Sequence, residues 1–259
     1  MKLNASNVDL EYDESEKMLY ADGVEVPFST RKVGEMKDVL FRPDFINEKN
    51  KNDIIYRMFR NAGVSKNQTI FDAHNIRYDV TSIEDYDLGG EFTKTLGHYH
   101  PIVENGLAYP EIYEVLFGEA VYLLQKKNEN GSYEVILVHA KKGDKVIMPP
   151  NYGHISINIG GSVLVEANLV NSTFTSDYQS IKNMHGGAVY VLRKDNMVVN
   201  KEYKDVSIAH QDAKTPEFLD QSKGLYDEYI SQPKHFVFLN RPEFLLWSHD
   251  RWDISSQHF

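Results

Sequence analysis

Histidines in two segments of the chain have the types and spacing that a metal site requires. His98 and His100 stand one residue apart within residues 93–125, which are rich in Thr, Tyr, Val and Leu and therefore favour β-strands. In a strand, residues two apart point to the same face, so both imidazoles project together. A third histidine, His154, follows a Pro-Pro turn within residues 143–158. Three neutral imidazoles and one carboxylate would complete a site for a divalent first-row metal.

A His-x-His pair on its own is more often two ordinary strand histidines than a metal site. The third histidine raises the odds, because the Pro-Pro turn and Gly153 place the imidazole of His154 at a fixed entry into a strand. The remaining histidines have no such context, and a surface or satisfied core position explains each: His74, His139, His185, His210, His235, His249 and His258.

The fourth ligand should be a carboxylate, and Glu104, Glu111, Glu114 and Glu119 all lie within reach in the sequence. Glu104 falls in a Glu-Asn-Gly stretch, which predicts a loop tip facing water. Glu111 begins a predicted strand, where alternation puts Glu111 and Tyr113 on one face and Glu114 on the other. We therefore select Glu111.

These motifs together resemble the paired motifs of the cupin superfamily. The longer run GHYHP…GLAYPEIYE…PPNYGHISINIG is similar, more narrowly, to the cupin-type glucose-6-phosphate isomerases of archaea and some bacteria. The resemblance covers roughly residues 8–195. Its residues are His98 and His100, Glu111 with Gly118 seven positions later, Gly143 through Pro149, and His154 to Asn158.

The resemblance implies a mainly β fold, a cupin-like antiparallel jelly-roll barrel with a few peripheral helices, assembled as a homodimer. It implies a divalent metal, Fe²⁺ in the first place, with Zn²⁺, Mn²⁺ or Ni²⁺ as alternatives. The implied ligands are His98, His100, Glu111 and His154. The implied catalytic residues are Glu111 and Tyr113, and those that place the sugar phosphate are Thr81, Thr95, Gly97 and Tyr178.

The sequence departs from the family's pattern at several points. The gap between His100 and Glu111 is longer than is usual in the superfamily. A histidine that some members carry before Asp177 is Ser176 here, and a tyrosine proposed near the substrate in some members falls at Val170. Neither residue can then be essential. The chain after about residue 200 has no counterpart in the shorter members.

The implied chemistry moves a proton between C1 and C2 of an aldose 6-phosphate and so interconverts glucose 6-phosphate and fructose 6-phosphate. This needs an electrophile at the carbonyl and a group that carries the proton. Glu111 could be that carrier, or a ligand only, with a hydride shift as the other route. An Fe(II) cupin oxygenase and a non-catalytic sugar-binding cupin are the rival functions.

Composition bounds these alternatives. The chain has 259 residues, 41% of them hydrophobic, which suffices for a substantial core, and it has no cysteine, which excludes disulfides and thiolate ligands. A net charge of -10 and a pI near 5.5 argue against nucleic acid as a partner. No signal-like or membrane-spanning apolar run occurs, so we expect no membrane partner and a cytoplasmic protein.

The elements that must position the site are mostly short strands. We expect an outer hairpin over residues 8–27 about Asp22-Gly23. A second hairpin joins residues 114–125 and 133–139 about Asn130-Gly131. Further strands are predicted at 69–83, 155–158 and 163–170, and another hairpin at 188–200 about Asp195-Asn196.

Three helices are predicted around these strands. Residues 43–63 have apolar residues near helical spacing and should cover a sheet. Residues 172–184 could form a helix capped by Ser172, and Thr215-Pro216-Glu217 is a good helix start. We divide the chain into residues 1–200, the isomerase domain, and residues 201–259, an extension. Its apolar end at 236–252 should pack on the barrel or across a dimer interface.

Overall fold

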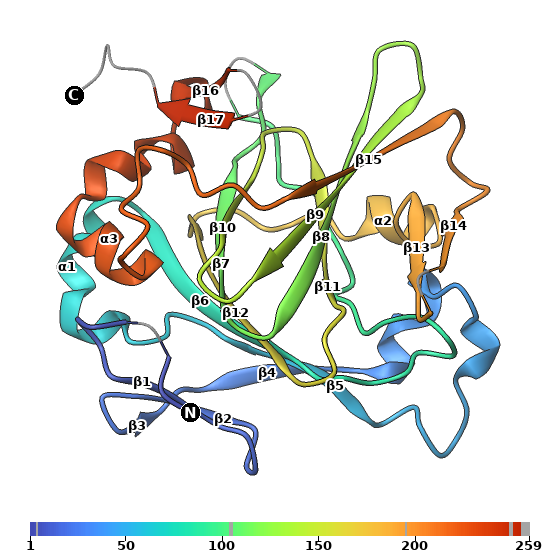
Figure 1. Ribbon diagram of the computed structural model, residues 1–259, viewed down its shortest axis with the longest axis horizontal. Helices are drawn as coiled ribbons and strands as arrows, with labels where there is room; N and C mark the ends of the chain where they lie inside the picture. The colour runs from blue at the N-terminus through green and yellow to red at the C-terminus, as the bar shows by residue number, and fades with distance from the viewer. Residues whose placement is uncertain (4, 104–105, 195, 249–250, 255–259) are drawn as a thin grey trace.

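Two facing β-sheets form the body of the chain in the computed structural model, which describes residues 1–3, 5–103, 106–194, 196–248 and 251–254. The larger sheet has the strand order β10-β7-β12-β6-β5-β4 and the smaller β11-β8-β9-β15 (Figure 1). The larger consists of β4 (Phe28–Lys32), β5 (Ile54–Phe59), β6 (Ile76–Ile83), β7 (Glu111–Phe117), β10 (Lys145–Met148) and β12 (Leu164–Asn171), and the smaller of β8 (Glu119–Lys127), β9 (Tyr133–Lys141), β11 (Gly153–Asn158) and β15 (Val206–Asp212).

The sheets enclose one core and each carries a second on its outer face. Between the sheets, Val115 of β7 and Leu164 of β12 share a cluster with Leu124 of β8. Both faces of β6, β7 and β12 are therefore covered, and nearly all their residues are buried. The predicted mainly β, jelly-roll fold is confirmed, with one difference: β15 pairs with β9 in parallel.

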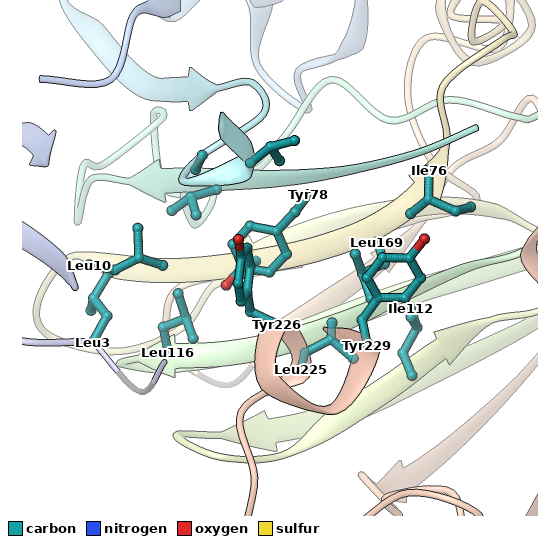
Figure 2. Close-up of a cluster of buried hydrophobic side chains, with 14 of the residues drawn as sticks. Leu3, Leu10, Ile76, Tyr78, Ile112, Leu116, Leu169, Leu225, Tyr226 and Tyr229 are labelled. Atoms are coloured by element: carbon teal, nitrogen blue, oxygen red, sulfur yellow. The ribbon is translucent and has the colours of Figure 1, made fainter. Parts of the chain in front are cut away.

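The chain beyond residue 200 contributes to the outer core of the larger sheet. Helix α3 (Leu225–Ser231) turns Leu225, Tyr226 and Tyr229 towards the strands, where they meet Tyr78 and Leu169 (Figure 2). The following 3-10 turns (Pro233–Leu239 and Pro242–Phe244) are also largely buried there, ahead of the ribbon β16 (Leu245–Ser248) and β17 (Arg251–Ile254). The predicted side-chain burial beyond Leu245 lies outside the described residues.

Smaller elements complete the fold. The predicted outer hairpin is present as β1 (Leu10–Asp13), β2 (Met18–Ala21) and β3 (Val24–Glu25), with Asp22-Gly23 between β2 and β3. The β8–β9 hairpin is also confirmed, as is that of β13 (Val189–Leu192) and β14 (Asn196–Val199), although Asp195 lies outside the described residues. Among the described residues, no helix is long and apolar enough to cross a membrane.

The predicted helix over residues 43–63 is wrong. This stretch holds a 3-10 turn at Pro43–Phe45 and then β5, which pairs with β4 and β6 inside the larger sheet. Ile55 and Phe59 are spaced as on one face of a helix, but both also fit a strand whose two faces are buried. Pairing on both edges of β5 decides the outcome, since it satisfies the backbone groups of the strand.

Three other boundaries also differ from expectation. The first third of the predicted strand 69–83 is helix α1 (Gln68–Ala73), preceded by a 3-10 turn (Val64–Asn67). The predicted helix 172–184 is reduced to α2 (Gln179–Asn183). The helix expected to start at Thr215 begins only at Leu225. Its buried apolar residues are Leu225, Tyr226 and Tyr229. A further 3-10 helix (Val33–Val39) follows β4.

Candidate metal centre

Two glycines allow the histidine segments to meet. His98 N donates to His154 O at 3.3 Å and His154 N to His98 O at 3.1 Å, an isolated bridge rather than the regular strand expected around His98. Gly97 has φ +81°, and a Cβ there would lie 2.5 Å from the nearest side-chain atom. A Cβ on Gly153 would lie 2.5 Å from the Tyr99 ring. Glycine at both positions therefore permits the contact that pairs the imidazoles.

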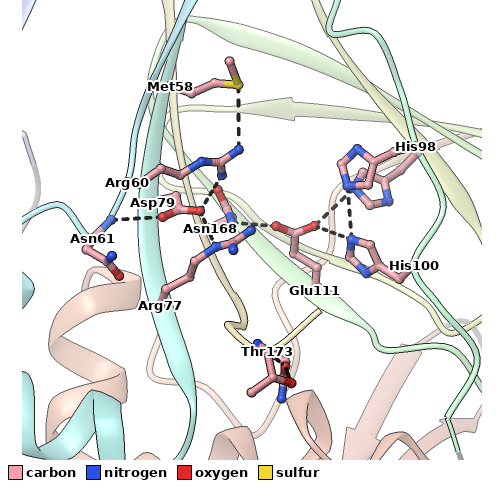
Figure 3. A network of polar contacts seen from close by, with 12 residues as sticks. Met58, Arg60, Asn61, Arg77, Asp79, His98, His100, Glu111, Asn168 and Thr173 are labelled. Carbon is pink, nitrogen blue, oxygen red and sulfur yellow. Dashed lines mark hydrogen bonds and ion pairs between the residues drawn. The ribbon is translucent and has the colours of Figure 1, made fainter. Parts of the chain in front are cut away.

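Four side chains converge on one point between the sheets. Ligand-type atoms of His98, His100, Glu111 and His154 all lie within 4.8 Å of one another (Figure 3). Oε2 of Glu111 is 3.1 Å from Nε2 of His154 and 3.4 Å from Nε2 of His100. His98 Nε2 is 3.1 Å from His100 Nε2. The predicted group of three imidazoles and one carboxylate is thus brought together in the folded chain.

The hydrogen bonds of this group fit a bound cation. Nδ1 of His100 lies 2.8 Å from the carbonyl oxygen of Tyr109, so Nδ1–H donates outward and the Nε2 lone pair faces the group. Oε2 of Glu111 and Nε2 of His154 are buried and form no hydrogen bond within the described part of the chain. A divalent ion would satisfy all these lone pairs at once, and imidazole with carboxylate suits Fe, Zn, Mn or Ni.

Burial and neighbours set the protonation states that such a site needs. Burial, together with His154 and His100, lowers the pKa of His98 well below its ordinary value. Burial also lowers the pKa of His100 to about 4, although Glu111 opposes this shift. For Glu111, burial favours the neutral acid, but contacts with His154 and His100 outweigh it and hold the pKa below the ordinary value. Near neutral pH, Glu111 is ionised and His98 and His100 are neutral.

The other glutamates lie elsewhere. Oε2 of Glu114 accepts from the N–H of Leu225, on the face of β7 opposite Glu111, as alternation predicts. Glu119 is exposed at the start of β8. Glu104 lies outside the described residues. The choice of Glu111 therefore agrees with the geometry.

A pocket of about 50 Å³ opens beside the four side chains. Every residue that the sequence assigned to substrate or catalysis lines it, and so do Val170 and Ser176, the two departures from the family pattern. Oγ1 of Thr95 accepts from Ser156 N at 3.0 Å, and the ring of Tyr178 lies 5.2 Å from that of His98. The assigned lining residues are Thr81, Thr95, Gly97, Tyr113 and Tyr178.

Sequence reasoning missed four polar residues that share this pocket: Arg60, Arg77, Glu166 and Asn168. Asn168 Nδ2 donates to Oε1 of Glu111 at 2.5 Å and so fixes the carboxylate from the side opposite the histidines. Strand alternation could have found three of the four. Arg77 lies four residues before Thr81 on β6, so both side chains point to the same face. Glu166 and Asn168 lie four and two residues before Val170 on β12, so they share its face. Arg60 was missed because residues 43–63 were wrongly predicted to form a helix.

Glu166 is the second carboxyl group of the pocket. It is 1% exposed, and the hydroxyls of Ser156 and Tyr122 face it from the other sheet. Burial raises the pKa of Glu166 to about 8, the charge of Glu111 adds to the increase, and the two hydroxyls oppose it. Its Oε2 has no well-formed hydrogen bond to any described residue. Glu166 is therefore mostly a neutral acid at pH 7.

A larger hollow of about 520 Å³ lies elsewhere, lined by Lys126, Glu134 and Tyr152 among others. It contains none of the four converging side chains. Tyr152 donates to Glu134 there. We place the functional site in the smaller pocket because Oε2 of Glu111 and Nε2 of His154 converge there, buried and without a hydrogen-bond partner among the described residues.

The fold and this site define a jelly-roll protein of the cupin type with four side chains that could hold a metal ion. The family glucose-6-phosphate isomerase (GPI) matches residues 30–208, and the chain belongs to that family. A glucose-6-phosphate isomerase of Thermococcus onnurineus (strain NA1) is 24% identical over 153 residues, 59% of this chain and 74% of the relative. One of Thermococcus gammatolerans (strain DSM 15229 / JCM 11827 / EJ3) is 29% identical over 108 residues, 42% of this chain and 53% of the relative.

Similar solved structures include an oxalate oxidase, with a TM-score of 0.32 and 13% identity over 45% of this chain and 51% of the other. An oxalate decarboxylase of Bacillus subtilis gives a TM-score of 0.36 and 11% identity over 52% of this chain and 31% of the other.

Proposed function

We propose that this protein is a metal-dependent aldose–ketose isomerase that interconverts glucose 6-phosphate and fructose 6-phosphate. The observation that carries the proposal is the buried convergence of three imidazoles and one ionised carboxylate beside a pocket lined by hydroxyl groups. The choice of substrate follows from membership of the glucose-6-phosphate isomerase family.

His98, His100, Glu111 and His154 would hold one divalent ion. We propose Fe²⁺ as the native metal, since imidazole and carboxylate ligands with open positions suit it, and Zn²⁺, Mn²⁺ and Ni²⁺ as ions that the same donors accept. When bound, the ion polarises the substrate's carbonyl group and stabilises negative charge on its oxygens.

Glu111 would carry the proton. Its carboxylate would remove the hydrogen from C2 of the aldose as a proton and return it to C1, while the hydroxyl proton at O2 moves to O1. Asn168 holds Oε1 and so fixes the orientation of the carboxylate during both transfers. An ionised Glu111 is required at the start, which agrees with its lowered pKa.

The remaining pocket residues would orient the sugar. Burial, and the charge of Glu111, raise the pKa of Tyr113 well above its ordinary value, so the phenol stays protonated and can donate a hydrogen bond to a sugar oxygen. Thr81, Thr95, the Gly97 amide and Tyr178 add neutral donors around the sugar phosphate. Together they position the substrate without adding charge.

A coupled assay of fructose 6-phosphate conversion to glucose 6-phosphate tests the function. Turnover should vanish after chelation and return when Fe²⁺, Zn²⁺, Mn²⁺ or Ni²⁺ is added separately, the most active ion indicating the native metal. Oxygen consumption, recorded alongside, should be zero. Turnover that survives complete metal removal, or oxygen uptake in place of isomerisation, would contradict the proposal.

The homodimer and the cytoplasmic location remain proposals from the family. Light scattering on the purified protein tests the dimer, with a monomer mass as the contrary result. Cell fractionation tests the location.

A further inference from the structure

Gln125 is a polar side chain buried on the outer face of the smaller sheet, away from the pocket. It is fully buried, and β8 places it directly opposite Gly153 of β11. Its Nε2 donates to the hydroxyl of Tyr99 at 2.8 Å and to that of Tyr203 at 3.1 Å, and its Oε1 accepts from Ala188 N at 2.7 Å. Both N–H groups and the carbonyl oxygen of this amide are therefore used.

Tyr99 reaches the amide across a glycine. In the extended segment that it shares with His98 and His100, alternation points Tyr99 to the face opposite the two imidazoles. Its ring lies over Gly153, where a Cβ would be 2.5 Å from the ring. Because Gly153 has no side chain, the ring can cross β11 and its hydroxyl can meet Gln125 on β8. The histidine segment, residues 97–100, is thus attached to the smaller sheet from the outer face.

The backbone of Tyr99 joins a second part of the site. Tyr99 N donates to Asp177 O at 3.0 Å, and Asp177 N donates to Tyr99 O at 2.8 Å. On the other edge of the same segment, His98 pairs with His154. Tyr178, which lines the pocket, follows directly after Asp177. A shift of Tyr99 would therefore move one metal-type ligand relative to another and displace the Tyr178 side of the pocket.

The histidine segment needs an anchor because it is not part of a regular strand. Its described pairing consists of isolated bridges, and Gly97, with φ +81°, lies just before the bridge between His98 and His154. A functional constellation has to be held to within about 0.5 Å by side chains that packing and hydrogen bonds fix in place. One bridge with two hydrogen bonds of 3.1 and 3.3 Å constrains the imidazoles less than a full ladder would. The bond between Tyr99 and Gln125 adds the missing constraint.

We infer that Tyr99 and Gln125 are positioning residues of the metal centre: their hydrogen bond holds the histidine segment at the distance from β11 at which one divalent ion can bind all three imidazoles. The inference rests on the proposed function. It concerns the support of the ligands rather than contact with the substrate, since neither residue lines the pocket. Both therefore act through the segment that carries the histidines.

The test compares Tyr99→Phe with Tyr203→Phe, since each change removes one hydroxyl from the same amide. Tyr99→Phe keeps the ring but releases the histidine segment, so the affinity for Zn²⁺ should fall by about tenfold, the lower end of the range for groups that orient a metal ligand. Tyr203→Phe is the matched control, because its hydroxyl donates to Gly186 O at 2.8 Å rather than holding the histidine segment. Its Zn²⁺ affinity should be unchanged. Competition with a chelator measures both affinities.

A second readout reports the geometry of the ligands. Co²⁺ also binds imidazole and carboxylate sites, and its visible absorption depends on how the ligands are arranged. The bands should shift and broaden in Tyr99→Phe and coincide with those of the wild type in Tyr203→Phe. Gln125→Leu removes the whole amide and should give the same spectral change with a larger loss of Zn²⁺ affinity. Thermal unfolding of every variant is recorded alongside.

The outcomes separate a positioning role from a structural one. Unchanged Zn²⁺ affinity and Co²⁺ spectrum in Tyr99→Phe, with only lower thermal stability, would overturn the inference, since the hydrogen bond would then serve the fold alone. An equal loss of affinity in Tyr203→Phe would also overturn it, because the effect would then be a general loosening of the sheet. Weaker binding confined to Tyr99→Phe and Gln125→Leu supports the inference, even if the wild type fails to convert fructose 6-phosphate. The proposed function alone would then fail.

Discussion

The pocket contains two buried carboxyl groups, Glu111 and Glu166, that are in opposite protonation states. Both are at most 3% exposed and both lie on strands of the larger sheet. Glu111 has its pKa held below the ordinary value and is ionised, whereas the pKa of Glu166 is raised to about 8 and the group is mostly neutral at pH 7. Burial alone favours the neutral form of each. The difference must come from their neighbours.

Glu111 faces His100 and His154 and accepts a hydrogen bond from Asn168. Glu166 faces the hydroxyls of Ser156 and Tyr122, and the nearby charge of Glu111 repels its ionised form. Separating the two pKa values in this way gives one pocket both a base and a neutral hydrogen-bond donor. The partners of a buried acid, rather than its depth, therefore determine its chemical role.

The largest effect should come from removing two of the three histidines around Glu111. The double variant His98→Ala, His154→Ala should lose almost all of the roughly one divalent ion per chain expected for this ligand set. Glu111 would also lose His154, the neighbour that lowers its pKa most, and turnover should disappear. Metal analysis after dialysis measures the effect.

The matched control is the double variant His139→Ala, His210→Ala, a surface pair whose ring nitrogens are 3.2 Å apart and which lies outside the metal group. It should keep the full metal content. If the His98→Ala, His154→Ala variant kept its full metal content, the ion would have to bind elsewhere.

Neutralising Glu111 itself should have the next largest effect. Glu111→Gln keeps the size and a carbonyl ligand, so metal should remain partly bound, while turnover falls by about two to four orders of magnitude, the usual contribution of a general base. Deuterium at substrate C2 should exchange with water in the wild type. Near-normal turnover in the metal-loaded variant, with deuterium transferred to product without exchange, would instead support a hydride shift.

Removing the amide that orients Glu111 should have a smaller effect. Asn168→Ala leaves Oε1 without its donor, and the metal affinity should fall by about 10- to 100-fold, as for other groups that orient a ligand. Asn171→Ala is the control, because Asn171 belongs to the same strand but bonds Asn240 on its outer side. Titration with Zn²⁺ measures both; equal affinities would show that Asn168 does not support the site.

The effect of Glu166 should appear mainly in the pH dependence of stability. Its folded-state pKa lies above the ordinary 4.5, so the folded chain binds the extra proton, and unfolding releases it between pH 4.5 and about 8. The wild type should therefore lose stability relative to Glu166→Gln as pH rises through this range, by up to about 1.4 kcal/mol per pH unit. Denaturant unfolding at pH 5 and pH 8 checks it; parallel curves would contradict the raised pKa.

The Glu111 half of this comparison could be predicted from sequence, and the Glu166 half could not. Motif spacing identified Glu111 and its histidines because those residues lie in short, recognisable segments. Glu166 occurs in a run of buried strand residues where alternation predicts an inward side chain but not its protonation state, which depends on the opposite sheet. Arg60 follows β5, whose apolar spacing suits either a helix or a strand, and only sheet pairing resolves that ambiguity.

Infrared difference spectroscopy at pH 7 on metal-loaded protein measures the protonation states of Glu111 and Glu166 directly. Subtracting the Glu166→Gln spectrum from that of the wild type should reveal a carbonyl band of a protonated carboxylic acid, which disappears as the pH is raised above about 8. Subtracting the Glu111→Gln spectrum should reveal only carboxylate bands. A protonated band assigned to Glu111, or carboxylate bands from Glu166 at pH 7, would contradict the assignment of one ionised and one neutral acid to this pocket.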